Sequence, residues 1–301
     1  MLSRKNKLLL LKVLSLFSVV RGYNLLMIVL AQYLASIYIL SPNLPVRQVV
    51  FDVNLFIIVV ATVLVIAAGY IINNFYDAEK DLINKPRKTM LDRLVSQRFK
   101  LSSYFVLNFL AVLAASYVSF RAVLFFSAYI FGIWFYSHKL KKIPFVGNFV
   151  SATLAITPFF AVFVYYKNFE TVIFVHALFL FLLILARELI KDLENISGDL
   201  AQNYRTIPII YGVGVSKWLI GILMLMTLIP SLLLIFKFDV GYMNYYFAGC
   251  ILLFILFLAI LFKSSTRKHF LWLHNILKLV IVVGVFSILL IDVDLVLNRI
   301  L

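Results

Sequence analysis

Residues 53–81 read VNLFIIVVATVLVIAAGYIINNFYDAEKD, an apolar run followed at once by three acidic residues. The apolar part, 53–76, is long enough to cross the hydrocarbon core of a bilayer as one helix. Acidic groups beside a bilayer are costly and usually mark a functional pathway or site. This stretch therefore predicts a membrane helix with a functional site at its end.

The whole chain has the composition of a membrane protein. Of its 301 residues, 64% are hydrophobic and 14% are charged, whereas soluble domains are about half apolar and a quarter charged. Apolar runs recur at roughly 18–40, 53–76, 102–120, 122–137, 146–166, 171–190, 216–236, 241–262 and 271–292. These runs lack the alternation of barrel strands. We therefore expect an all-α polytopic membrane protein of about nine transmembrane helices, forming one domain over residues 1–301.

The net charge of +15 comes from basic residues spread over short loops between the runs. This spread favours a role in membrane topology and lipid contact, not nucleic-acid binding. On the side of the N-terminus lie 22 Lys and Arg, against 5 on the other side, and Lys278 falls inside the last run. The bias predicts a multi-pass protein of the cell (inner) membrane with a cytoplasmic N-terminus. The single cysteine, Cys250, allows no disulfide or cysteine-based metal site within the chain.

A second acidic cluster follows the sixth apolar run, on the same predicted side as the first. A four-residue step turns a helix by only about 40°, so the side chains of each cluster share one helical face. Helix caps in solvated loops would explain single Asp and Asn residues, but not two clusters with this spacing. Carboxylate and amide oxygens facing each other suit Mg²⁺ bound to substrate phosphates. The expected metal ligands are Asn73, Asp77, Asp81, Asp192, Asn195 and Asp199.

Basic residues beside both clusters could hold the phosphates of a diphosphate substrate. They are Lys85, Arg87, Lys88, Lys139, Lys141, Lys142, Arg187, Lys191 and Arg205. The same residues could instead set the topology. Tyr136 could stabilise an allylic cation by a cation–π contact, or it could belong to the aromatic belt at the interface. His138 and His176 lack the spacing of metal ligands and are interpreted as solvated or packed residues.

Three segments carry a family resemblance. They are Asn73-Asn-Phe-Tyr-Asp77-Ala-Glu-Lys-Asp81-Leu-Ile-Asn84-Lys-Pro86, Tyr136-Ser-His-Lys-Leu-Lys141, and Arg187-Glu-Leu-Ile-Lys-Asp192-Leu-Glu-Asn195-Ile-Ser-Gly-Asp199 continued by Arg205-Thr-Ile-Pro208. They resemble the signatures of the UbiA superfamily of intramembrane prenyltransferases. The resemblance implies nine helices around a central lipid-open cavity, with a polyprenyl diphosphate and Mg²⁺ at its cytoplasmic mouth and the prenyl tail among aromatic and aliphatic side chains.

The resemblance also implies roles for particular residues. Asn73, Asp77 and Asp81 would serve one Mg²⁺, and Asp192 and Asp199 the other. Lys141 would contact the diphosphate. Lys88 and Arg205 are expected as further phosphate contacts because of their charge beside the clusters, not because of the resemblance. Two positions depart from the pattern. Asn195 stands where Asp is more usual, which removes one negative charge, and Arg87-Lys-Thr lacks the usual Pro after Arg.

The acceptor is less constrained by the sequence. The run from Arg187 to Asp199 is most similar to the branch that alkylates geranylgeranylglyceryl phosphate, which favours geranylgeranyl diphosphate as donor. An aromatic acceptor, as in quinone biosynthesis, remains the main alternative, with haem and other acceptors behind it. A membrane transporter is the alternative from another class, but it predicts polar sites near mid-bilayer. A CDP-alcohol phosphotransferase would need Gly at the position of Asn73.

Overall fold

The computed structural model describes residues 4–293, with side chains from residue 10 onward. The topology count included Arg4, Lys5, Lys7 and Arg299, whose side chains lie outside this part. The expected domain of residues 1–301 likewise extends beyond the described residues at both ends. The described chain is helical throughout: α1 (Arg4–Val19), α2 (Gly22–Ala35) with the π-helix η1 (Ser36–Leu40), α3 (Val46–Val50), α4 (Val53–Tyr76), α5 (Ala78–Asn84), α6 (Pro86–Asp92), α7 (Gln97–Val118), α8 (Phe120–His138), η2 (Leu140–Lys142), α9 (Val146–Tyr166), α10 (Thr171–Ala201), α11 (Ile207–Phe236), η3 (Gly241–Met243), α12 (Asn244–Lys263), α13 (Arg267–Ser287) and η4 (Ile288–Leu290).

Nine helices within residues 4–293 are long and apolar enough to cross a membrane. The all-α fold with nine spans is therefore confirmed, and most boundaries agree with the apolar runs. The sixth apolar run ends near 190, and α10 continues to Ala201, so the second acidic cluster lies on a helix as its spacing predicts. Contacts from Asn84 of α5 and Arg267 of α13 hold these last turns of α10 in place.

Polar caps explain where several helices begin. Asp52 accepts hydrogen bonds from the backbone N–H groups of Asn54 (2.9 Å) and Leu55 (3.3 Å) at the start of α4. Ser119 is the only residue between α7 and α8, and its hydroxyl accepts from the Ala122 N–H at 3.1 Å. These caps satisfy N–H groups that a helix start leaves without partners. The third and fourth spans, α7 and α8, thus form a tight helical hairpin.

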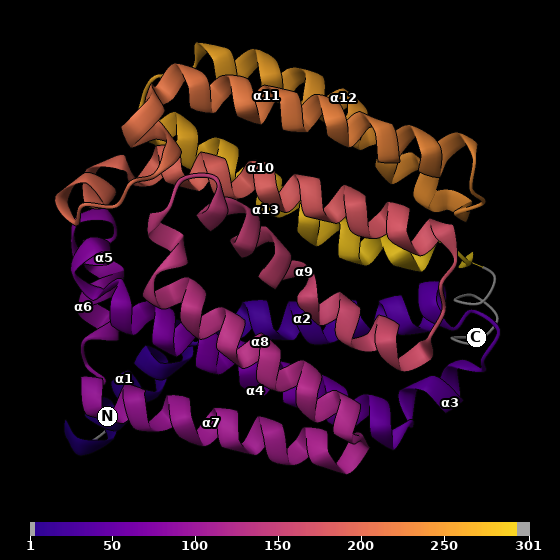
Figure 1. Cartoon of the computed structure of the whole chain (residues 1–301), viewed down its shortest axis with the longest axis horizontal. Coiled ribbons are helices and arrows are strands. Elements are labelled where there is room, and N and C mark those ends of the chain that lie inside the picture. Colours follow the sequence, from indigo (N-terminus) through magenta and orange to yellow (C-terminus); the bar gives the residue numbers. More distant parts are fainter. Residues whose placement is uncertain (1–3, 294–301) are drawn as a thin grey trace.

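The two helices that carry the acidic clusters are the most buried spans of the bundle. In α4 and α10, 61% of the apolar window is buried, against 17–39% in the other spans. Figure 1 shows α10 running through the middle of the bundle, with α11 and α12 on one side and α9 and α2 on the other. Helices α5 and α6 lie at one end of the bundle, and α3 lies at the opposite end (Figure 1).

Three residues weighed in the sequence have simple places in the fold. Cys250 is a buried free cysteine in α12. His138 is the last residue of α8 and is exposed, stacked on Trp134. His176 lies in α10, with its ring against Phe247. The described residues bring neither histidine into a metal-binding group.

Candidate active site

The first acidic cluster lies where α4 passes into α5. Asp77 caps α5 in a bent conformation (φ −94°, ψ 6°). The helical hydrogen bonds nevertheless continue across it: the Asp77 N–H donates to the Asn73 carbonyl at 2.9 Å, and the Asp81 N–H donates to the Asp77 carbonyl at 2.8 Å. Asn73, Asp77 and Asp81 therefore keep the common face that their spacing predicts.

Asp77 is only 7% exposed and is held by two donors from distant parts of the chain. Lys141 Nζ lies 2.7 Å from Asp77 Oδ1 and also donates to Asn73 Oδ1 at 3.3 Å. The Tyr204 hydroxyl donates to the same Asp77 oxygen at 3.0 Å. Burial raises the pKa of Asp77, but the charges of Lys141 and Lys80 with these hydrogen bonds outweigh it, so its pKa lies below the ordinary value. Asp77 is therefore a carboxylate at neutral pH.

The second acidic cluster lies on the last three turns of α10. Asp192 Oδ2 accepts from Asn148 Nδ2 of α9 at 2.7 Å. Asp199 is fully buried, and Lys80 Nζ of α5 lies 2.5 Å from its Oδ1. Apart from this lysine, neither carboxylate oxygen of Asp199 has a hydrogen-bond partner among the described residues, and nor has Asn195 Oδ1.

Lys80 joins the two clusters. Its ammonium group pairs with Asp199 and lies 4.5 Å from the centre of the Tyr204 ring. Burial lowers the pKa of Lys80, but the charges of Asp77 and Asp199 outweigh this effect and raise its pKa. The two acidic clusters thus face each other across one ammonium group, as the expected pair of opposed clusters requires.

A second contact between α5 and α10 fixes their spacing. The Asn84 side chain accepts from the Gly198 N–H at 3.1 Å and donates to the Asn195 carbonyl at 3.4 Å. A Cβ added at Gly198 would lie 2.3 Å from Asn84 Nδ2, so only glycine allows this approach. Arg267 of α13 donates to the carbonyls of Asn84 and Glu194 and closes the junction from the other side.

The residues present fit a divalent metal that also binds substrate. Within the described residues, no three His, Cys, Asp or Glu side chains converge on one metal position. Mg²⁺ commonly uses one or two carboxylates and completes its octahedron with water and substrate phosphates. Unpartnered acceptor oxygens on Asp199 and Asn195, facing the ionised Asp77 across Lys80, supply such a donor set. Of the six expected ligands, Asn73 and Asp77 share Lys141, Asp199 pairs with Lys80, and Asp192 is held by Asn148, so the described residues form no closed protein shell of six oxygens.

The other predicted residues differ in their burial and in their contacts. Asp81 is half-buried, and so is Tyr136 near the C-terminal end of α8. Lys88 Nζ lies 3.8 Å from Asp92, and burial, followed by the charge of Arg21, lowers its pKa. The Arg205 side chain is exposed, and its backbone N–H donates to the Lys142 carbonyl at 3.1 Å.

Three further residues contact the acidic clusters, and sequence reasoning gave none of them a role. Lys80 lies inside the first quoted segment, between Asp77 and Asp81. Tyr204 directly precedes the Arg205 segment, and Asn148 follows the quoted segment 136–141 and belongs to the same resemblance. Their place in or beside these segments was the only signal that the sequence offered. Their partners, Asp199, Asp77 and Asp192, are far away in the chain.

A buried network supports the end of α4 from the side away from Asp77. Asn74 Nδ2 donates to Asp92 Oδ2 at 3.0 Å, and Lys100 Nζ donates to Asn74 Oδ1 at 2.8 Å. The Ser18 hydroxyl donates to the other Asp92 oxygen at 2.9 Å. Asp92 and Lys100 are both buried. The network therefore joins α1, α4, α6 and α7 behind the first acidic cluster.

Exchanging the amide and the acid tests this network. Asn74→Asp alone places two carboxylates against each other and should cost about 1–3 kcal/mol of unfolding free energy. Adding Asp92→Asn restores one donor and one acceptor across the contact, so the double variant should recover most of that loss. Thermal unfolding in detergent measures both. If the loss in the double variant equals the sum of the losses in Asn74→Asp and Asp92→Asn measured separately, the contact does not couple these residues.

Comparison with known proteins decides the family. The profile of the UbiA prenyltransferase family matches residues 24–279, which span all the site residues described above. The chain belongs to the UbiA prenyltransferase family. It is therefore a membrane prenyltransferase, and the transporter alternative is set aside.

Curated relatives of this UbiA-family chain carry a common name. A digeranylgeranylglyceryl phosphate synthase of Thermococcus sibiricus is 34% identical over 225 residues, covering 74% of this chain and 79% of the relative. The protein of the same name in Methanobrevibacter smithii is 26% identical over 263 residues, covering 83% and 88%.

Solved structures of the family share the fold. A digeranylgeranylglyceryl phosphate synthase structure matches with a TM-score of 0.70 at 22% identity, covering 92% of this chain and 97% of the other. A UbiA homologue from Archaeoglobus fulgidus, solved with GPP and Mg²⁺ bound, matches with a TM-score of 0.66 at 14% identity, covering 91% and 99%.

Proposed function

We propose that this protein transfers a polyprenyl group, with geranylgeranyl favoured, from its diphosphate to (geranylgeranyl)glyceryl phosphate, with Mg²⁺ as cofactor. The observation that carries the proposal is the opposition of Asp77 and Asp199 across Lys80, with Lys141 beside them. Acids and ammonium groups interleaved in this way bind a metal–diphosphate complex better than either charge alone would. The names of the curated relatives support the glycerol phosphate acceptor.

In this proposal Asp77 and Asp199 hold Mg²⁺, with Asn73, Asp81, Asp192 and Asn195 completing the oxygen set of the two clusters. Mg²⁺ neutralises charge that develops on the diphosphate as the allylic C–O bond breaks. The side chains of Asn148 and Tyr204 orient Asp192 and Asp77 by hydrogen bonds.

The lysine and arginine side chains of the protein have separate proposed roles. Lys141 and Lys80 lie within hydrogen-bond reach of the acids and can donate to phosphate oxygens in the same space. Lys88 and Arg205 are proposed as outer phosphate contacts: Lys88 has only a long 3.8 Å contact with Asp92, and the Arg205 side chain is exposed. Tyr136 is proposed to lie near the allylic carbon, where its ring would stabilise positive charge. The acceptor hydroxyl then forms the new C–O bond and releases its proton, and diphosphate leaves.

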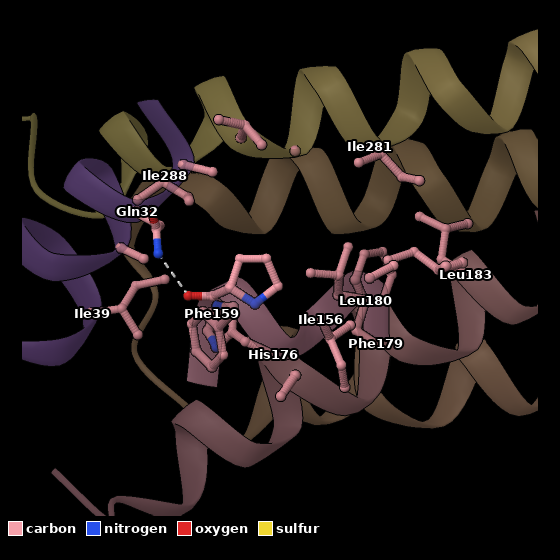
Figure 2. A pocket seen from close by; sticks show the side chains of 18 of the residues that line it. Gln32, Ile39, Ile156, Phe159, His176, Phe179, Leu180, Leu183, Ile281 and Ile288 are labelled. Carbon is pink, nitrogen blue, oxygen red and sulfur yellow. Dashed lines mark hydrogen bonds between the residues drawn. The ribbon is translucent and has the colours of Figure 1, made fainter. Parts of the chain in front are cut away.

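An apolar cavity offers space for the prenyl tail. Its volume is about 230 Å³, and its walls come from α2, η1, α9, α10, η3, α12, α13 and η4. Figure 2 shows aliphatic and aromatic side chains, among them Ile156, Leu180 and Leu183, pointing into it. Such a lining suits a hydrocarbon chain whose diphosphate is held elsewhere.

We place the acidic clusters at the cytoplasmic face of the cell membrane. The basic loops that precede α9 and follow α4 lie at the same end of the chain's spans as the clusters. The positive-inside rule assigns that end to the cytoplasm. Cytosolic isoprenoid diphosphates and Mg²⁺ would then reach the site directly.

An acceptor panel tests the proposal. Purified protein with Mg²⁺ receives geranylgeranyl or farnesyl diphosphate together with glycerol phosphate lipids, 4-hydroxybenzoate-type aromatics, or no acceptor. We expect a product whose mass equals that of geranylgeranylglyceryl phosphate plus the prenyl group minus one hydrogen, and diphosphate release that depends on both substrates. A prenylated aromatic as the main product would assign the protein to the quinone branch instead.

A further inference from the structure

The apolar cavity and the acidic site share one face of α9. Ala155 and Phe159 line the cavity, and Asn148, which lies seven and eleven residues before them, contacts Asp192. Steps of seven and eleven residues bring a helix back to within about 20° of the same direction. On α10, the cavity lining ends at Ile184, about two turns before Asp192. The apolar lining and the acidic site therefore follow one another along α9.

Gln32 of α2 closes the end of the cavity that is far from the acids. Its side-chain Nε2 donates to the Pro158 carbonyl at 2.8 Å and to Thr62 Oγ1 at 3.2 Å. Thr62 in turn donates its hydroxyl to the Ile58 carbonyl at 2.8 Å, so it can only accept from Gln32. These contacts fix the amide orientation and tie α2 to α4 and α9. Figure 2 shows the bond from Gln32, with Ile39 and Ile288 beside it.

The same end carries two polar atoms without partners. Gln32 is 2% exposed, and its Oε1 has no donor among the described residues. His176 Nδ1 faces the Val172 carbonyl at 2.9 Å. A carbonyl only accepts, so Nδ1 carries the proton and the buried Nε2 is left as an unpartnered acceptor. A hydrocarbon chain cannot hydrogen-bond to either atom. An apolar chain that extends past Gln32 and His176 therefore gains little binding free energy.

The distance to this end is set by rigid helices. Ten residues separate Asn148 from Pro158 on α9, a rise of about 15 Å. Sixteen residues separate His176 from Asp192 on α10, a rise of about 24 Å. Asn148 and Asp192 contact each other, as do Pro158 and Gln32. The wall at Gln32 therefore stands at a fixed depth from the acidic site.

We propose that Gln32, with His176 beside it, is the stop that limits the length of the prenyl chain this protein uses. The inference rests on the proposed function, because it treats the cavity as the place of the donor tail. The stop is a hydrogen-bonded side chain held on three helices, so it cannot swing aside as a free aliphatic side chain could.

The test compares farnesyl, geranylgeranyl and farnesylgeranyl diphosphates by kcat/KM. The wild type should use geranylgeranyl diphosphate at least about tenfold better than farnesylgeranyl diphosphate, the scale of discrimination that pocket size gives. Gln32→Ala should remove most of that difference by accepting the longer chain. His176→Ala should act in the same direction, and it serves if loss of the Gln32 contacts impairs folding. Leu26→Ala is the matched control on α2, because Leu26 is 67% exposed toward lipid; its donor preference should not change.

The outcomes separate the stop from the activity. If the wild type releases diphosphate from none of the donors, the proposed function fails and the inference falls with it. If the wild type turns over geranylgeranyl diphosphate but already uses the longer donor equally well, or if both variants keep the wild-type ratio, the function stands and the stop is wrong.

Discussion

Replacing Asp77 or Asp199 by alanine should lower prenyl transfer by on the order of a thousandfold or more while the protein stays folded. A bound metal contributes several kcal/mol of charge stabilisation, and each 1.4 kcal/mol is about tenfold in rate. Asp77 is ionised and buried, and Asp199 has carboxylate oxygens with no partner except Lys80. Release of labelled diphosphate at saturating Mg²⁺ measures the effect.

Glu79→Ala is the matched control for both variants. It removes one negative charge from α5, between Asp77 and Asp81, but the Glu79 side chain is 69% exposed, and its one ion pair among the described residues is with Arg93, at 3.4 Å. Activity should stay close to that of the wild type. Near-normal turnover in both aspartate variants would contradict the assignment of Asp77 and Asp199 to the metal.

Removing divalent cations should abolish turnover yet change the melting temperature little. Asp77 has Lys141 at 2.7 Å and Asp199 has Lys80 at 2.5 Å, so each buried acid keeps a positive partner without metal. A metal site built only of acids would instead lose stability through repulsion when the metal is removed. Chelation followed by Mg²⁺ addition, with activity and thermal unfolding measured on the same sample, tests both parts.

Lys141→Met provides the control. Without its ammonium group the buried Asp77 carboxylate is left with Tyr204 and the nearby charge of Lys80, which should cost about 3 kcal/mol or more. Added Mg²⁺ should restore part of that loss in this variant. A large drop in melting temperature when wild-type protein is chelated, or activity that survives chelation, would show that the lysines do not hold the acids as described.

Much of this arrangement could be predicted from the sequence. Apolar runs of membrane length predict nine spans, and four-residue spacing predicts that Asn73, Asp77 and Asp81 share a face; the structure confirms both. These features are local, because helix geometry relates residues that are close in the chain. The four-residue logic also places Asp192, Asn195 and Asp199 on a helix, and α10 does continue to Ala201. The contacts from Asn84 and Arg267 that hold these last turns come from distant parts of the chain, and the sequence gives no sign of them.

What the sequence could not supply is the pairing of distant side chains. The pairs are Lys80 with Asp199, Tyr204 with Asp77, and Asn148 with Asp192, and each joins segments that are far apart in the chain. Such pairs depend on how α5, α9 and α10 pack, and no local pattern encodes that packing. The same holds for Gln32, whose partners Thr62 and Pro158 lie on two other helices.

The central claim is that Asp77 and Asp199 hold a divalent metal against a diphosphate. Anomalous scattering from crystals grown with Mn²⁺, as a stand-in for Mg²⁺, and a non-reactive geranylgeranyl thiodiphosphate tests it most directly. We predict metal peaks bonded to oxygens of Asp77 and Asp199, with the diphosphate between them. Bound diphosphate contacting only lysines, with Lys141–Asp77 and Lys80–Asp199 still paired and no metal peak, would contradict the claim.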